Sequence, residues 1–150
     1  MPELSDLYQQ IIVEHNRSPR NFKKLPHPTN AAEGSNPLCG DQIRLEVTLD
    51  GDRIADIGFQ GSGCAISQAS ASLLTGAVLG KTRADAEALF QAVHAMLTAV
   101  PDAPVDAAKL GKLAALAGVR RFPVRVKCAS LPWHTLRAAL ETAAKSVTTE

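Results

Sequence analysis

This chain has few cysteines, little net charge and no long apolar run, and each shortage excludes a class of protein. The net charge of +1 over 150 residues gives no strong field that would attract nucleic acid or an acidic membrane surface. No stretch approaches the roughly 18 continuous apolar residues of a membrane span. The first eight residues carry acids where a secretory signal has a basic and then an apolar region. We therefore expect a cytoplasmic protein that binds neither nucleic acid nor membrane.

The chain contains three cysteines, and none of them forms a C-x-x-C pair. The gaps between Cys39, Cys64 and Cys128 are 24 and 63 residues long, which is not the spacing of a zinc ribbon. An odd number of thiols cannot all pair within one chain, and the cytoplasm keeps thiols reduced. Free thiols or metal ligands are therefore the two interpretations.

Signatures of nucleotide binding and of serine hydrolases are also missing. Gly58, Gly61 and Gly63 have the wrong spacing for a dinucleotide fingerprint, and there is no Walker lysine. No G-x-S-x-G elbow is present. None of the histidines has another histidine three or four residues away, so paired histidine ligands are not indicated. His134 alone remains as a spare ligand that could approach Cys128.

A period of two in the apolar residues predicts a small antiparallel sheet. Strict alternation over 43–49 indicates a half-buried strand. The Asp50-Gly51 pair indicates a hairpin turn into a second strand over 53–60. A short edge strand near 29–34 completes the expected three-stranded sheet.

Apolar residues at helical spacing predict helices around this sheet. The expected helices cover 4–15, 64–79, 83–98, about 110–118 and 133–145. Periodicity does not resolve 122–128, which we interpret as a helical turn that starts near Pro123 and ends before Pro132. The predicted fold is a single α+β domain over residues 1–150, with helices packed on one face of the sheet.

Each cysteine lies at the end of a predicted element. Cys39 is in a Pro/Gly turn two residues before Asp41, Cys64 follows a glycine loop, and Cys128 lies near a break. Element ends display functional groups, whereas structural cysteines usually lie mid-element on an apolar face. The cysteines are therefore either three small buried residues or, together with Asp41, four ligands of a kind that suits zinc.

Such a metal site would be strongly anionic. Three thiolates and a carboxylate around a divalent cation leave an excess of two negative charges, which is costly in a partly buried site without nearby cations. Arg125 and Lys127 flank Cys128 and could offset this charge, or they are two solvated surface charges. The start of a helix at Cys64 would stabilise a thiolate there.

These motifs resemble the iron-sulfur cluster assembly family that includes IscU, SufU and the N-terminal domain of NifU. The matching segments are Asn-Pro-Leu-Cys-Gly-Asp at 36–41, 61–72, 125–128, and His15 with 19–21. The resemblance covers about residues 4 to 142 and implies a SufE/NifU-like fold. Lys127 stands where IscU-type scaffolds carry a histidine before the third cysteine. The long interval between the second and third cysteines is a feature of the SufU branch.

Similarity to that branch implies a zinc-dependent sulfurtransferase. Such a protein accepts persulfide sulfur from a SufS-type cysteine desulfurase and delivers it to downstream cluster-assembly proteins. The implied zinc ligands are Cys39, Asp41, Cys64 and Cys128. We expect Cys39 to receive the sulfur, because the Pro/Gly turn that carries it is the most mobile of the three cysteine positions. We expect Arg125 to stabilise the anionic intermediate.

Two other functions fit the same residues. The first is a scaffold on which a [2Fe-2S] cluster is assembled and handed on, since three cysteines and an aspartate can hold a cluster. The second is a protein whose zinc is purely structural and whose surface docks a partner.

Overall fold

Four strands form one sheet in the order β3-β2-β1-β4. The computed structural model describes residues 4–37, 40–141 and 146–148. The strands are β1 (Asn30–Asn36), β2 (Asp41–Asp50), β3 (Arg53–Ser62) and β4 (Ser146–Thr148). The first three pair antiparallel, as predicted. The short β4 pairs parallel with β1 and was not expected from the sequence.

The alternation that predicted β2 matches its burial. Ile43, Leu45 and Val47 are buried, and Gln42 and Arg44 are exposed. Glu46 departs from the alternation, because it is buried and its carboxylate accepts the backbone N–H of Leu25. The turn into β3 pairs Asp50 with Arg53, and Gly51 takes a φ of +62° that other residues rarely adopt. The Asp50-Gly51 pair therefore forms the predicted hairpin turn.

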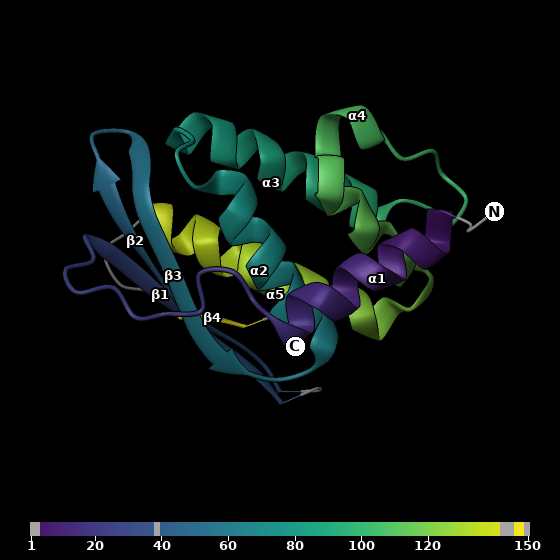
Figure 1. The fold of residues 1–150 in the computed structure, drawn as a ribbon, viewed down its shortest axis with the longest axis horizontal. Helices are drawn as coiled ribbons and strands as arrows, with labels where there is room; N and C mark the ends of the chain where they lie inside the picture. Colours follow the sequence, from purple (N-terminus) through teal and green to yellow (C-terminus); the bar gives the residue numbers. More distant parts are fainter. Residues whose placement is uncertain (1–3, 38–39, 142–145, 149–150) are drawn as a thin grey trace.

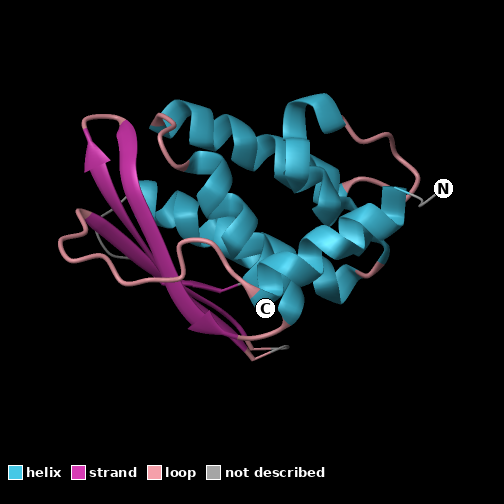
Figure 2. Ribbon diagram, in the orientation of Figure 1, coloured by secondary structure: helices cyan, strands magenta, loops and turns pink. Residues whose placement is uncertain are grey.

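The helices gather on one side of the sheet (Figures 1 and 2). They are α1 (Leu4–Arg17), α2 (Ala65–Val78), α3 (Arg83–Thr98), α4 (Ala107–Leu110), the 3-10 helix η1 (Gly111–Arg121) and α5 (Pro123–Glu141). The helix α5 packs directly on β1 and β2, and α2 packs on α5. None of the described helices is long and apolar enough to cross a membrane.

The prediction of a short helix that closes at Gly118 was wrong at that end. The segment is a four-residue α4 followed by η1, which continues through Gly118 to Arg121. A glycine ends a helix when it takes a positive φ, and Gly118 does not, whereas Gly111 has a φ of +57°. Gly111 therefore marks the change from α4 to η1.

The predicted break at Pro132 was also wrong, because α5 runs through this residue. A proline removes one N–H from the helix and leaves nearby carbonyls poorly bonded. Hydroxyl groups supply donors around it. Ser130 Oγ donates to the carbonyl of Lys127, Thr135 Oγ1 to that of Leu131, and Ser70 Oγ of α2 to that of Ala129.

The core lies between the inner face of the sheet and the helices. Its largest fully buried side chains include Leu45 and Ile57 from the strands and Leu74, Leu116 and Trp133 from the helices. Each such side chain contributes about 1.5–3 kcal/mol by leaving water. This packing brings the starts of β2 and α2 against the N-terminal part of α5.

Candidate metal centre

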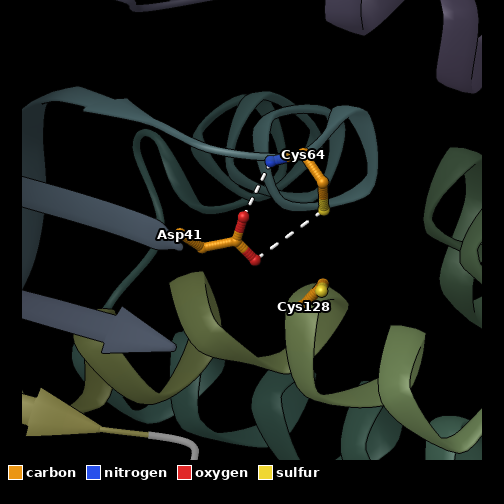
Figure 3. Close-up of side chains that lie close together, drawn as sticks. All are labelled: Asp41, Cys64 and Cys128. Carbon is orange, nitrogen blue, oxygen red and sulfur yellow. Dashed lines mark hydrogen bonds between the residues drawn. The ribbon is translucent and has the colours of Figure 1, made fainter. Parts of the chain in front are cut away.

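Three of the four predicted ligands converge at this junction. Asp41 is the first residue of β2, Cys64 directly precedes α2, and Cys128 lies in the second turn of α5. One ligand atom from each residue lies within 4.8 Å of the other two. Figure 3 shows the three side chains pointing toward one another from their separate elements. This cluster could hold a metal ion.

Asp41 is buried, and its carboxylate is hydrogen-bonded to the backbone of Cys64. Its Oδ1 accepts a hydrogen bond from the backbone N–H of Cys64 at 2.7 Å, and its Oδ2 lies 3.7 Å from Cys64 Sγ. Gly63, with a φ of +153°, permits this approach, because a Cβ there would lie 2.9 Å from the Cα and Cγ of Asp41. Gly61 and Ser62 end β3, and Gly63 after them gives the Asp41 carboxylate room to approach Cys64.

Cys64 is the N-cap of α2. Its Sγ accepts from the backbone N–H of Ser67 at 3.5 Å, in the way a serine or aspartate oxygen usually does at this position. The sequence predicted Cys64 in the first turn of the helix, whereas the structure places it one residue before the helix begins, at the N-cap. The side chain is half-buried and faces the N-terminal end of the helix dipole, which favours negative charge.

Cys128 is fully buried, and its sulfur has a polar neighbour. The Nδ2 of Asn36 donates to Cys128 Sγ at 3.7 Å. Asn36 is the last residue of β1 and pairs with Asp41 across the sheet. No role of its own was predicted for Asn36 from the sequence. A signal was available, because the alternation along β1 puts Asn36 on the inner face with Ala32 and Gly34.

The donor set fits a divalent zinc ion. Zinc bonds of about 2.3 Å to sulfur and 2.0 Å to oxygen at a tetrahedral angle place two ligand atoms roughly 3.5 Å apart. The 3.7 Å between Asp41 Oδ2 and Cys64 Sγ is close to that separation. Thiolate and carboxylate are both ordinary zinc ligands, and three described ligands leave a fourth position for another residue.

Cys39, the fourth predicted ligand, lies outside the described residues. It belongs to the short connection between Asn36 and Asp41, which face each other at the ends of β1 and β2. Arg125 is exposed in the first turn of α5. Its side chain lines a groove of about 570 Å³ together with residues that include Tyr8, Ile66 and Phe122.

His134 is not part of the described ligand cluster. Its ring packs against Phe90 and His94, with centroids 5.2 and 5.9 Å away. Burial lowers the pKa of His134, and the charges of His94 and Arg137 lower it further. The structure therefore gives this histidine a packing role between α3 and α5.

His15 anchors the N-terminal segment to the helix that follows Cys64. It is buried, and its Nδ1 lies 2.7 Å from the hydroxyl of Ser72 in α2, which also accepts the backbone N–H of Arg20. Asn21 Nδ2 donates to Thr75 Oγ1 one turn further along α2. These bonds hold α1 and the 18–21 turn against α2.

Comparison with known proteins identifies relatives along nearly the whole chain. Residues 7–129 match the family described as the NifU-like N terminal domain. The chain is 42% identical over 134 residues to the zinc-dependent sulfurtransferase SufU of Bacillus subtilis, covering 89% of this chain and 88% of that one. It is 38% identical over 146 residues to the iron-sulfur cluster assembly scaffold protein IscU of Streptococcus pyogenes, covering 97% and 90%. The crystal structure of FiSufU from thermophilic Fervidobacterium Islandicum AW-1 superposes with a TM-score of 0.81 at 33% identity, covering 92% and 99%.

Proposed function

Because this chain belongs to the NifU-like N-terminal domain family of iron-sulfur cluster assembly proteins, we propose that it is a zinc-dependent sulfurtransferase of the SufU type. It accepts persulfide sulfur from a SufS-type cysteine desulfurase and passes it to downstream cluster-assembly proteins. The observation that carries this proposal is the convergence of Asp41, Cys64 and Cys128 from three separate elements.

In this proposal Cys39, Asp41, Cys64 and Cys128 hold the zinc ion. Two trans peptide units of about 3.8 Å each keep the Cα of Cys39 within about 7.6 Å of the Cα of Asp41. A ligand from this connection is therefore within reach of the described cluster. Bound zinc keeps coordinated thiols deprotonated at neutral pH.

The sulfur transfer is a thiolate exchange. The thiolate of Cys39 attacks the outer sulfur of the desulfurase persulfide, and a new S–S bond forms on Cys39. The S–S bond inside the donor persulfide breaks, and the desulfurase cysteine leaves as a thiolate with the bonding electron pair. No external oxidant or reductant is needed, because one persulfide replaces another. A second exchange of the same kind moves the sulfur to the acceptor.

The surroundings of the other ligands support the choice of Cys39 as the acceptor. Cys128 is fully buried, and Cys64 caps α2 with its sulfur bonded to a backbone N–H. Both have fixed structural positions. Arg125, exposed one helical turn before Cys128, is the cation proposed to steady the anionic persulfide. Arg125 lines a groove that also includes Ile66, two residues after Cys64. This groove offers the desulfurase an apolar contact.

The alternative is a scaffold that builds a [2Fe-2S] cluster on the same residues. The similarity to the streptococcal IscU favours this function, since that protein is named as a scaffold. Anaerobic purification separates the two: colourless protein with one zinc per chain supports the transferase. Brown protein with stoichiometric iron and sulfide supports the scaffold. An increase in cysteine desulfurase turnover on adding the zinc protein would further support sulfur transfer.

A further inference from the structure

Asn36 is a buried carboxamide whose N–H points at a ligand sulfur. The side chain is fully buried, and Nδ2 donates to Cys128 Sγ at 3.7 Å. Its Oδ1 has no hydrogen-bond partner among the described residues. An unpaired buried carbonyl costs about 1–3 kcal/mol. An apolar residue would avoid that cost, so packing alone does not account for an asparagine here.

Each of the three described ligands accepts a hydrogen bond from an N–H group. Asp41 accepts the backbone N–H of Cys64, and Cys64 accepts the backbone N–H of Ser67. Cys128 accepts the side-chain N–H of Asn36. Neutral donors of this kind offset negative charge inside a protein without burying a cation. Asn36 is the one donor of the three that a substitution can remove without altering the main chain.

The position of Asn36 keeps its donor in place. The residue ends β1 and pairs with Asp41, so the strand that carries one ligand also fixes the donor to another. Cys128 is on α5, which packs against β1. A thiolate only accepts hydrogen bonds, which matches the orientation with Nδ2 toward sulfur.

We propose that Asn36 is a positioning residue that keeps Cys128 as a permanent and unreactive metal ligand. The N–H···S bond orients the sulfur and withdraws charge from the thiolate. A less basic thiolate is a poorer nucleophile, and an oriented one binds the metal more tightly. The inference rests on the metal centre of the proposed function and not on its sulfur transfer.

Cobalt substitution tests this bond in the isolated protein. Co²⁺ in place of zinc shows a thiolate-to-metal charge-transfer band whose energy depends on how strongly the sulfur holds its electrons. In Asn36→Leu, whose side chain has the same branching and the same number of heavy atoms but no donor, the band moves to longer wavelength. The dissociation constant for zinc, measured against a competing chelator, rises about 10–100-fold.

Thr135→Val is the matched control. Thr135 is also fully buried and polar, and it lies on α5, but its hydroxyl donates to the carbonyl of Leu131 and not to sulfur. This variant should leave the cobalt band in place. If Asn36→Leu does not fold, as judged by circular dichroism, Asn36→Ser gives the same measurement, because its hydroxyl is too short to reach Cys128.

The position of the band decides the matter. A shift in a folded Asn36 variant, with none in Thr135→Val, supports the proposal. An unmoved band overturns it, even if zinc affinity falls, because Asn36 would then act only through packing. The desulfurase takes no part in this experiment. A protein that shows the shift but accepts no sulfur would refute the proposed function and leave the role of Asn36 intact.

Discussion

The backbone N–H of Cys64 donates to Oδ1 of Asp41 at 2.7 Å, so a hydrogen bond directly links two of the candidate ligand residues. This bond joins the start of β2 to the start of α2. Hydrogen bonds to a charged acceptor contribute about 1.5–3 kcal/mol. Asp41 therefore has two roles, one in the fold and one as a ligand, and two substitutions can separate them.

Asp41→Asn keeps an Oδ1 acceptor and removes the charge, whereas Asp41→Ala removes both. In metal-free protein we expect Asp41→Ala to lower the free energy of unfolding by about 1.5–3 kcal/mol and Asp41→Asn to lower it less. Both should weaken zinc binding, because an amide oxygen is a poorer zinc ligand than a carboxylate. Urea unfolding and chelator competition measure the two effects. Unchanged zinc affinity in both variants would show that Asp41 is not a ligand.

Gly63→Ala should damage the site through geometry alone. A Cβ would overlap the Asp41 carboxylate at a φ of +153° that alanine does not adopt easily. We expect a loss of about 1–3 kcal/mol in stability together with weaker zinc binding. Gly76→Ala in α2 is the control, since nothing lies within 4 Å of its Cβ position. That variant should gain about 0.4–1 kcal/mol. Equal effects of the two substitutions would contradict this account of Gly63.

The buried His15 predicts a loss of stability in mild acid. Burial lowers the pKa of His15 from 6.5, and the charge of Arg20 lowers it further, against opposing attraction from Glu14. Lys112 adds a smaller repulsion. Below pH 6.5 the unfolded chain therefore binds more protons than the folded one, and stability falls as the pH falls toward the folded pKa. Each unit of pKa shift corresponds to about 1.4 kcal/mol.

His15→Gln should flatten this pH dependence between pH 7 and 5. The remaining slope should belong in part to His134, whose pKa is also lowered, so His134→Gln is the second arm. The lowered pKa of Glu14 affects stability only below pH 4.5 and lies outside this window. Urea unfolding of zinc-loaded proteins at several pH values measures the slope. Parallel curves for wild type and His15→Gln would refute the role of His15.

Arg125→Ala should impair sulfur transfer and leave zinc content unchanged. If Arg125 steadies an anionic persulfide, its loss removes a charge-assisted interaction worth about 1.5–3 kcal/mol, which lowers the transfer rate by roughly 10–100-fold. Arg121→Ala is the control, because Arg121 is another exposed arginine nearby in sequence that pairs with Asp102. Equal transfer rates in the two variants would remove Arg125 from the mechanism.

Local sequence signals predicted the features that local physics determines. The β2–β3 hairpin follows from a period of two and a turn glycine, and the predicted helix over 83–98 is α3, with Thr82 as its N-cap. The grouping of Asp41 with Cys64 and Cys128 came from predicted positions at element ends and from family motifs, although the element-end prediction was wrong for Cys128, which lies inside α5. The structure brings these three together.

Other features depend on contacts between segments far apart in the chain. The passage of α5 through Pro132 is supported by a hydroxyl from Ser70, 59 positions from the carbonyl it serves. The bond from Asn36 to Cys128 spans 92 positions, and that from His15 to Ser72 spans 57. The local periodicity of a sequence carries no information about such long-range contacts. A single sequence therefore shows these side chains only as polar residues without an assigned partner.

The central claim is that Cys39 accepts sulfur while the zinc ion stays in place. The most direct measurement supplies a cysteine desulfurase with ³⁵S-cysteine and follows label on wild-type protein and on Cys39→Ser, with zinc content determined in both. We predict persulfide label on the wild type, none on Cys39→Ser, and most of the zinc retained by the variant. Full labelling of Cys39→Ser would contradict the account.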